Sequence, residues 1–468
     1  MLVLRHGLTS NDFARIARFI EENHVITPRT PPGTLELLPR EQMTFQHMID
    51  TIRRGYESFG FVPIETPVFE MKDVLLTKSG GETEKQVYFV QSTGSLQQGH
   101  EADLALRFDL TVPLARYVAE HERDLAFPFR RYQIQRVYRG ERAQRGRFRE
   151  FYQCDIDIIG KDKLSAGYDA EIPAIIAQIF EELNIGDFTI HFSNRKILLG
   201  LLAGYGVEDA EKQKLILREI DKLDKIGAGK VQEGMVALGL SDADAGKLLK
   251  LISFKGDNDH ALALLREQNA HHPIFQEGLG EITQVVEVLN TLNVRRARIN
   301  LAIARGLDYY TGTVYETLID AHPEFGSVCS GGRYDDLAGY YTRSKLPGVG
   351  MSIGLTRLYD QMQAQNLLQR APNTVQVMVA QLDPQLDQIG LVQAQKLRAA
   401  GLNVESYWES AKLDKKIRYA DKAGIPILVL LGMNEHASGK AIVKDLGAKT
   451  QYEVGYDDLD KKIRELLS

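Results

Sequence analysis

The pattern of apolar and polar positions predicts a helix followed by strands in the first third of the chain. From Met43 to Phe59 apolar residues recur every three or four positions, which is typical of an amphipathic helix, and Gly60 ends it. Strand patterns follow at QVYFVQ, at LALRFDLTV, in an arginine-rich segment that begins at Phe129, and at FYQCDIDII. Hairpin-like strands after a helix favour an antiparallel sheet in an α+β domain.

The pattern then changes twice. Between about residues 197 and 293, Leu, Lys, Asp and Glu recur at helical spacing, which predicts a helical insertion. Strand character returns after it, and beyond residue 370 short apolar strands alternate with helix patterns, as in a small α/β domain. The predicted organisation is a leader (1–27), a core in two parts (28–196 and 294–370), the insertion between them (197–293), and a C-terminal domain (373–468).

The arginine-rich segment carries eight arginines between Arg130 and Arg149 against one acid, Glu141. Arginine grips phosphate with a planar fork of donors and stacks on aromatic rings, so this segment predicts a polyanion site. The alternative is a solvated edge hairpin with surface arginines.

The strand FYQCDIDII sorts its side chains onto two faces, because successive residues of a strand point in opposite directions. One face is apolar, and the other carries an aromatic, an amide and two carboxylates: Phe151, Gln153, Asp155 and Asp157. We predict that this polar face lines a pocket. The alternative is that Asp155 and Asp157 are charges on an exposed edge strand.

Composition narrows the class of protein. The chain has 468 residues, of which 44% are hydrophobic and 26% charged, and no apolar run is long enough to suggest a membrane span. The only cysteines, Cys154 and Cys329, indicate neither a disulfide framework nor a zinc site, and the N-terminus lacks a signal-peptide core, so we expect a cytoplasmic protein. Because the net charge is −6, phosphate binding must depend on local patches.

Three short motifs carry little weight. Arg5 and His6 resemble the opening of phosphohistidine phosphatases, but a proline-rich stretch replaces the domain that such a motif needs. The glycines Gly348, Gly350 and Gly354 miss the dinucleotide-binding pattern, and we expect them to allow close packing of a helix. No P-loop pattern occurs.

Five segments together resemble the histidyl-tRNA synthetases, which are class II aminoacyl-tRNA synthetases. RGLDYYTGTVYE (305–316) and SGGRYDDL (330–337) resemble the two histidine signatures of that family, and YRGERAQRGRFREFYQ and GMSIGLTRL resemble its motifs 2 and 3. The helix and strand from Met43 to Glu70 resemble its motif 1. The resemblance runs from Pro28 to the C-terminus, and the class I motifs HIGH and KMSKS are absent. The forms RFDLTVP and FYQCDID look like the eukaryotic and archaeal branch, because Asp109 and Asp157 stand where the common bacterial pattern has glutamate.

The resemblance implies a site for ATP, which enters as a substrate with Mg²⁺; we expect no prosthetic group and no metal held by the protein itself. Arg139 would hold the α-phosphate and the amino-acid carboxylate, and Arg305 would lie beside that phosphate where other synthetases use a metal. The remaining residues implied for ATP are Arg147 at the γ-phosphate, Glu141 and Phe151 at the adenine, and Arg357 at the adenine and phosphates.

A histidine pocket must partner an ammonium group, a carboxylate and two ring nitrogens. The spacing of Asp109 and Thr111 on the predicted strand LALRFDLTV places them on one face, where the resemblance implies that they hold the ammonium with Gln153. The other residues implied for histidine are Asp157 and Tyr310 at the imidazole, Tyr334 closing the pocket, and Arg305.

For tRNA, the resemblance places Arg142 and Gln144 near the acceptor end and implies a C-terminal anticodon-binding domain. The basic patch in that domain includes Lys412, Lys415 and Lys416, although a salt-laced amphipathic helix would give the same pattern.

The expected protein therefore ligates L-histidine to tRNA(His) through a histidyl-adenylate, as a homodimer with no membrane association. One alternative is a histidine-sensing paralogue, such as the regulatory subunit of ATP phosphoribosyltransferase. Another is a synthetase-like RNA-binding module without catalytic activity.

Overall fold

The computed structural model describes residues 27–76, 86–142, 146–268, 270–303, 310–336 and 338–468. The chain divides into two compact units: one contains the described residues up to Glu36 and Met48–Leu368, and the other contains Leu37–His47 and Gln369–Ser468. The finer domain boundaries given above stay predictions.

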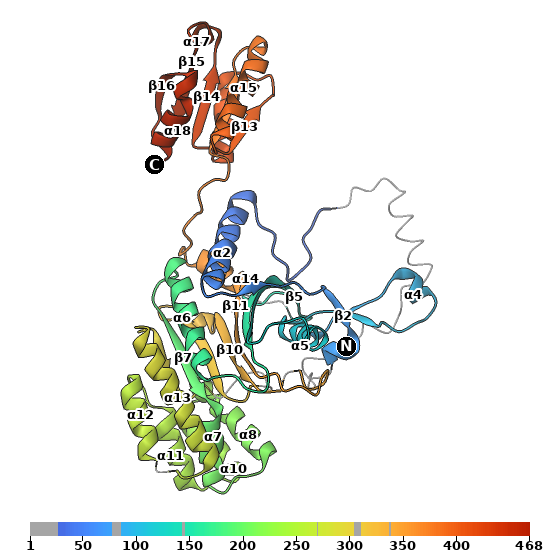
Figure 1. Ribbon diagram of the computed structural model, residues 1–468, viewed down its shortest axis with the longest axis vertical. Coiled ribbons are helices and arrows are strands. Elements are labelled where there is room, and N and C mark those ends of the chain that lie inside the picture. The colour runs from blue at the N-terminus through green and yellow to red at the C-terminus, as the bar shows by residue number, and fades with distance from the viewer. Residues whose placement is uncertain (1–26, 77–85, 143–145, 269, 304–309, 337) are drawn as a thin grey trace. The chain divides into compact units, whose positions relative to one another are not determined.

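The larger unit is built on an eight-stranded sheet (Figure 1). Its strands lie in the order β1 (Val62–Pro63), β5 (Phe129–Tyr138), β6 (Glu150–Ile159), β11 (Gly348–Gly354), β10 (Cys329–Tyr334), β9 (Thr313–Ile319), β7 (Phe188–Asn194) and β8 (Ala297–Ile299). The pairs β1–β5 and β7–β8 at the two edges are parallel, and all pairs between them are antiparallel. The predicted antiparallel core is confirmed.

Helix α2 (Pro39–Ser58) belongs to the larger unit from Met48 onward, and this part of it lies beside α6 (Gly167–Glu182). The missing side chain of Gly55 on α2 leaves room for Ile179 of α6. The hydroxyl of Tyr56 donates a hydrogen bond to the carbonyl of Cys154 in β6 at 2.8 Å. The predicted amphipathic helix is confirmed, and it begins at Pro39, four residues earlier than its periodicity indicated.

A second, three-stranded sheet joins β2 (Phe69–Met71), β4 (Leu104–Leu106) and β3 (Phe89–Val90). The short helices α3 (Lys72–Leu76) and α4 (Thr93–Gln97) belong to the same region. The prediction of a continuous strand over LALRFDLTV is wrong, because β4 ends at Leu106 and helix α5 (Thr111–Glu120) begins five residues later. The local signal for this helix start was Asp109 followed by Pro113, since a proline is tolerated in the first turn.

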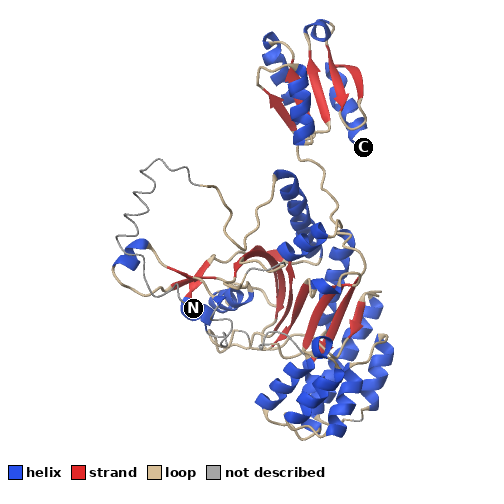
Figure 2. Cartoon of the chain, turned by 180° about the vertical axis from the view of Figure 1, so that it is seen from behind, coloured by secondary structure: helices blue, strands red, loops and turns tan. Residues whose placement is uncertain are grey.

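The chain between β7 and β8 is helical, as predicted (Figure 2). It forms α7 (Arg195–Gly204), α8 (Ala210–Ile220), α9 (Leu223–Ile226), α10 (Ala228–Ala237), α11 (Asp242–Ile252), α12 (Asn258–Glu267) and α13 (Pro273–Thr291). Side chains of Asp209, Ser241 and Asp257 cap three of these helices by accepting backbone N–H bonds. After β11, helix α14 (Leu355–Ala364) completes the larger unit.

The smaller unit has a five-stranded sheet in the order β13 (Val404–Tyr407), β12 (Val377–Gln381), β14 (Ile427–Leu431), β15 (Lys440–Asp445) and β16 (Thr450–Gly455). Helices α15 (Asp387–Ala399) and α18 (Leu459–Leu467) cover one face, and α16 (Leu413–Ala423) covers the other. The short α17 (Met433–Ala437) follows β14. Because both faces of β12 and β14 are buried, these strands read as continuous apolar runs. The predicted α/β arrangement is confirmed.

Within the described residues, no helix is long and apolar enough to cross a membrane.

Candidate active site

A cavity of about 440 Å³ lies against the polar face of the large sheet, within the size range of small-molecule sites. Nine residues predicted for ATP and histidine line it: Asp109, Thr111, Arg139, Glu141, Arg147, Phe151, Gln153, Tyr310 and Arg357. Two others, Asp157 and Tyr334, line a cavity of about 20 Å³ that shares Thr111, Tyr310 and Ser352 with the larger one. The sheet thus brings these residues together, whereas Arg305 and Gln144 lie outside the described residues.

Three arginines form the cationic end of the large cavity. Arg139 donates from Nε to the carbonyl of Phe108 at 3.0 Å, and its guanidinium lies over the ring of Phe151, 5.1 Å from the centroid. Arg147 is 3.5 Å from Glu141. Burial and, after it, repulsion from Arg147 lower the pKa of Arg357. Cations that repel each other in this way gain from a bound polyanion.

Not all arginines of the segment point to this cavity, so its interpretation as one polyanion site is too broad. Arg130 pairs with Glu171 at 2.6 Å, and Arg136 pairs with Glu150 at 3.4 Å. Arg142 is exposed and lines neither cavity.

Asp109 lines the large cavity just before the start of α5. Its Oδ1 accepts a hydrogen bond from the backbone N–H of Val112 at 3.1 Å. Burial raises the pKa of Asp109 to about 6, although this hydrogen bond and the charge of Arg139 oppose the rise. Asp109 and Thr111 therefore reach the same cavity from a helix start rather than from one face of a strand.

A buried ion pair holds the deep end of the site. Arg131 and Asp157 are directly opposite on β5 and β6, and Nη2 of Arg131 donates to Oδ2 of Asp157. The hydroxyl of Tyr334 donates to Oδ1 of the same carboxylate at 2.9 Å. Both charged residues are buried, so Asp157 is not a charge on an exposed edge strand. Sequence reasoning missed Arg131, whose only signal was its register opposite Asp157.

The glycines of β11 make room for these side chains. A Cβ at Gly350 would overlap the carboxylate of Asp157, and a Cβ at Gly348 would overlap the ring of Tyr334. Our expectation that these glycines pack a helix is wrong for Gly348 and Gly350, which lie in β11 beside Tyr334 and Asp157, whereas Gly354 ends the strand with ordinary space around it.

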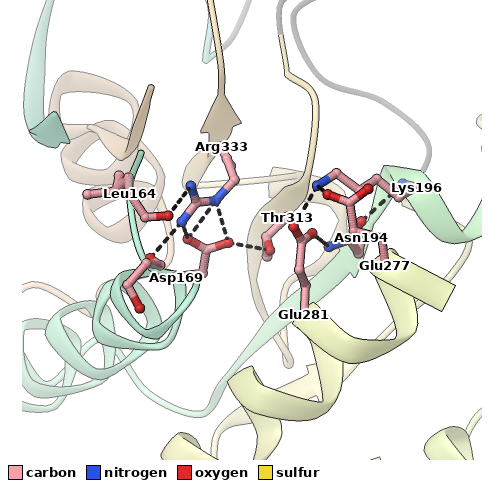
Figure 3. A network of polar contacts seen from close by, with 9 residues as sticks. Leu164, Asp169, Asn194, Lys196, Glu277, Glu281, Thr313 and Arg333 are labelled. Atoms are coloured by element: carbon pink, nitrogen blue, oxygen red, sulfur yellow. Dashed lines mark hydrogen bonds and ion pairs between the residues drawn. The ribbon is translucent and has the colours of Figure 1, made fainter. Parts of the chain in front are cut away.

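A second buried ion pair anchors β10, the strand that carries Tyr334 (Figure 3). Arg333 donates from Nη2 to Asp169 of α6 at 2.5 Å, and Thr313 of β9 donates to the other carboxylate oxygen at 2.6 Å. Arg333 also donates to the carbonyl of Leu164 at 3.1 Å. Since adjacent residues of a strand face opposite sides, fixing Arg333 behind the sheet directs Tyr334 into the site.

Across the part of the chain that the structure describes, no group of three or more His, Cys, Asp or Glu residues could hold a metal ion.

In the smaller unit, Lys412 and Lys415 are exposed, as expected of an RNA-binding patch. Lys416 is buried and donates to the carbonyl of Gln381 at 2.5 Å, so its inclusion in that patch is wrong. The side chain of Lys416 lies on the face of α16 that packs on the sheet, and its ammonium group donates to a backbone carbonyl there.

The Arg131–Asp157 pair generates a stability prediction. Asp157→Ala should lower the free energy of unfolding by roughly 3–5 kcal/mol, because it leaves a buried guanidinium without its counter-charge. Calorimetry suits the measurement, since the single tryptophan, Trp408, lies in the other unit. The double variant Arg131→Met with Asp157→Leu should recover most of the loss. A single variant as stable as the wild type would mean that Arg131 has another partner.

Comparison with known proteins agrees with this geometry. Residues 33–358 match the family model for histidyl-tRNA synthetase, and residues 376–466 match that of an anticodon binding domain. Histidine–tRNA ligases of Stenotrophomonas maltophilia (strain K279a) and Xanthomonas axonopodis pv. citri (strain 306) are each 54% identical, over 93% of this chain and 97% and 95% of theirs. Both relatives are bacterial, although the RFDLTVP and FYQCDID forms resemble the other branch.

Solved structures give the same result. Histidyl-tRNA synthetase from Nostoc sp. PCC 7120 is 42% identical with a TM-score of 0.87, covering 94% of this chain and 100% of that one. An ATP phosphoribosyltransferase regulatory subunit/histidyl-tRNA synthetase from Bacillus halodurans C, at 22% identity and a TM-score of 0.72 over 87% of this chain and 99% of that one, shows only a shared fold. The chain belongs to the histidyl-tRNA synthetase family.

Proposed function

We propose that this protein is a histidine–tRNA ligase, which activates L-histidine with ATP and transfers the histidyl group to tRNA(His). The observation that carries the proposal is one cavity lined by Arg139, Arg147 and Arg357 and also by Asp109 and Gln153. ATP brings a polyanion and histidine brings an ammonium group, so the arginines and Asp109 offer each of them a complement. A histidine-sensing paralogue would bind the amino acid without needing the cationic end.

In the first step, an oxygen of the histidine carboxylate attacks the α-phosphorus of ATP, and the bond to the leaving pyrophosphate breaks. Negative charge gathers at the α-phosphate, where a fixed guanidinium stabilises the transition state. Arg139 is suited to this role, because its bond to Phe108 and its stacking on Phe151 hold it in place before the substrates arrive. Arg147 and Arg357 then take the remaining phosphates, and Mg²⁺ enters as part of the ATP substrate.

In the second step, a hydroxyl of the terminal ribose of the tRNA attacks the histidyl carbonyl, and AMP leaves. Exposed Arg142 stands where an acceptor end could be bound by its phosphates. The roles of Arg305 and Gln144, which lie outside the described residues, stay predictions from the motifs. Both cysteines are free, which fits a reducing compartment such as the cytoplasm.

A homodimer is part of the proposal, and the three-stranded sheet offers the surface. Phe69 and Met71 of β2 and Leu104 of β4 are 50%, 47% and 38% exposed. Met71 and Leu104 are directly paired, and β2 is an edge strand with ladder groups available to another chain. An apolar edge of this kind suits a second copy of the chain.

Pyrophosphate exchange tests the catalytic proposal. The wild type should exchange pyrophosphate into ATP only when histidine is present. Arg139→Ala should slow exchange by roughly a hundredfold, the scale seen when a preorganised donor is lost. Arg136→Ala is the matched control, since Arg136 pairs with Glu150 outside the cavity and should be dispensable for exchange. No exchange by folded wild type would favour the sensing paralogue.

The dimer proposal is tested by mass in solution. Phe69→Glu with Met71→Glu should convert the dimer to a monomer, because two charges would be buried without partners. Sedimentation analysis gives the mass directly. Leu215→Glu, which alters an equally exposed leucine on α8, should remain dimeric. A monomeric wild type, or a dimeric double variant, would contradict the assignment.

The exposed lysines at the start of α16, Lys412 at its N-cap and Lys415 in its first turn, are tested by the salt dependence of tRNA binding. Lys412→Gln with Lys415→Gln should weaken binding and flatten its salt slope by up to about two phosphate contacts, since each neutralised phosphate releases roughly one counterion. Lys461→Gln removes an exposed charge from α18, on the other face of the sheet, and should leave the slope unchanged. An unaltered slope in the double variant would assign those lysines to a solvated helix face.

A further inference from the structure

Arg357 of α14 lines the large cavity, but the protein backbone holds part of its guanidinium group. Its Nη2 donates to the carbonyl of Phe325, while its Nε is buried and has no hydrogen-bond partner among the described residues. Arginine binds phosphate most firmly with two parallel N–H donors. In the free protein, one donor group of Arg357 is therefore committed to the backbone and another is unused.

The carbonyl of Phe325 has a second donor, Gln361. This residue follows Arg357 by four positions, so both side chains leave the same face of α14. Its Nε2 donates to the carbonyl at 3.1 Å, and the residue is only 9% exposed. A carbonyl oxygen has two lone pairs and can accept both bonds. The two donors therefore share one acceptor.

That acceptor lies in a tight turn between β9 and β10. The turn is the short helix η2 (Pro323–Phe325), and Gly326 after it takes the left-handed conformation with φ of 65°. Phe325 is buried, and the ring of His322 stacks on its ring with 4.9 Å between the centroids. A carbonyl in such a packed turn needs a protein donor, because a buried backbone oxygen without one is costly.

The two side chains also face the part of the chain that carries Arg147. A Cβ at Gly146 would lie 3.5 Å from Nε2 of Gln361 and 3.9 Å from Nε of Arg357. Burial, and after it the charge of Arg147, lowers the pKa of Arg357. Because the two cations repel each other, a bound phosphate chain is a better acceptor for Arg357 than an uncharged carbonyl is.

We propose that Gln361 is a positioning residue for Arg357: it keeps the carbonyl of Phe325 hydrogen-bonded when Nη2 of Arg357 exchanges that carbonyl for a phosphate oxygen of ATP. This inference rests on the proposed histidine–tRNA ligase function and refines its ATP site. Gln361 lines neither of the two cavities, so it acts through Arg357. Without it, the exchange would leave a buried acceptor unsatisfied, and ATP would bind more weakly by that amount.

The test is Gln361→Met, which keeps the length of the side chain and removes its N–H donors. In histidine-dependent pyrophosphate exchange the KM for ATP should rise roughly tenfold, the scale of one buried acceptor left without a donor, and the KM for histidine should stay unchanged. Gln363→Met is the matched control, because it makes the same change at an exposed position of α14 and should alter neither value.

A double-variant cycle separates positioning from a structural role. Titration calorimetry gives the Kd of ATP for the wild type, Gln361→Met, Arg357→Ala and the double variant, whether or not exchange is fast. In the Arg357→Ala background, Gln361→Met should leave the Kd unchanged, because no donor then has to be exchanged.

Thermal unfolding should show the complementary pattern. Gln361→Met alone should be about as stable as the wild type, since Arg357 still donates to Phe325 in the free protein. The double variant should be less stable than the two single variants together indicate, because the carbonyl then loses both donors.

Three results would overturn the role of Gln361. They are an unchanged KM for ATP in Gln361→Met, an equal rise in the KM for histidine, and additive effects of the two substitutions on the Kd of ATP. Absence of histidine-dependent exchange in the folded wild type would instead overturn the proposed function.

Discussion

The arrangement of the site depends on one constraint: a charge buried in a sheet must have a partner of opposite charge. Arg131 and Asp157 satisfy it across β5 and β6, and Arg333 and Asp169 satisfy it between β10 and α6. Between these two pairs lies Tyr334, which donates to the first pair and follows the second along the chain. The position of the aromatic wall of the small cavity is therefore set by two ion pairs rather than by packing alone.

The charges around the large cavity are separated into two groups. Arginines gather near the β5–β6 hairpin and α14, whereas burial raises the pKa values of Asp109 and Asp155 against the opposing charges of Arg139 and Arg131. Each group on its own destabilises the free protein through repulsion or desolvation. Substrates with a phosphate chain at one end and an ammonium at the other relieve both costs, so the separation favours binding of ATP and an amino acid side by side.

The sequence predicted the parts of this site that depend on local pattern. Period two along β6 placed Gln153 and Asp157 on one face, and the helical spacing before Gly60 identified α2. The predictions were wrong where contacts between distant parts of the chain determine the structure. Asp109 was predicted to lie in a strand, because apolar and polar residues continue to alternate past Leu106, but the chain forms helix α5 from Thr111. Lys416 read as a surface charge, although its ammonium reaches the carbonyl of Gln381 inside the domain.

Arg131 shows most clearly why the sequence could not predict the whole site. Nothing in the neighbouring sequence distinguishes it from the other seven arginines of the segment, and only the pairing of β5 with β6 places it opposite Asp157. Once that pair is known, the two aspartates of the FYQCDID form cease to be equivalent: one is held by an arginine and a tyrosine, and the other has an uncharged neighbour on each side. The pair also explains why Asp157 can be buried, because a charge away from water persists in a sheet only where an opposite charge and a hydrogen-bond donor satisfy it.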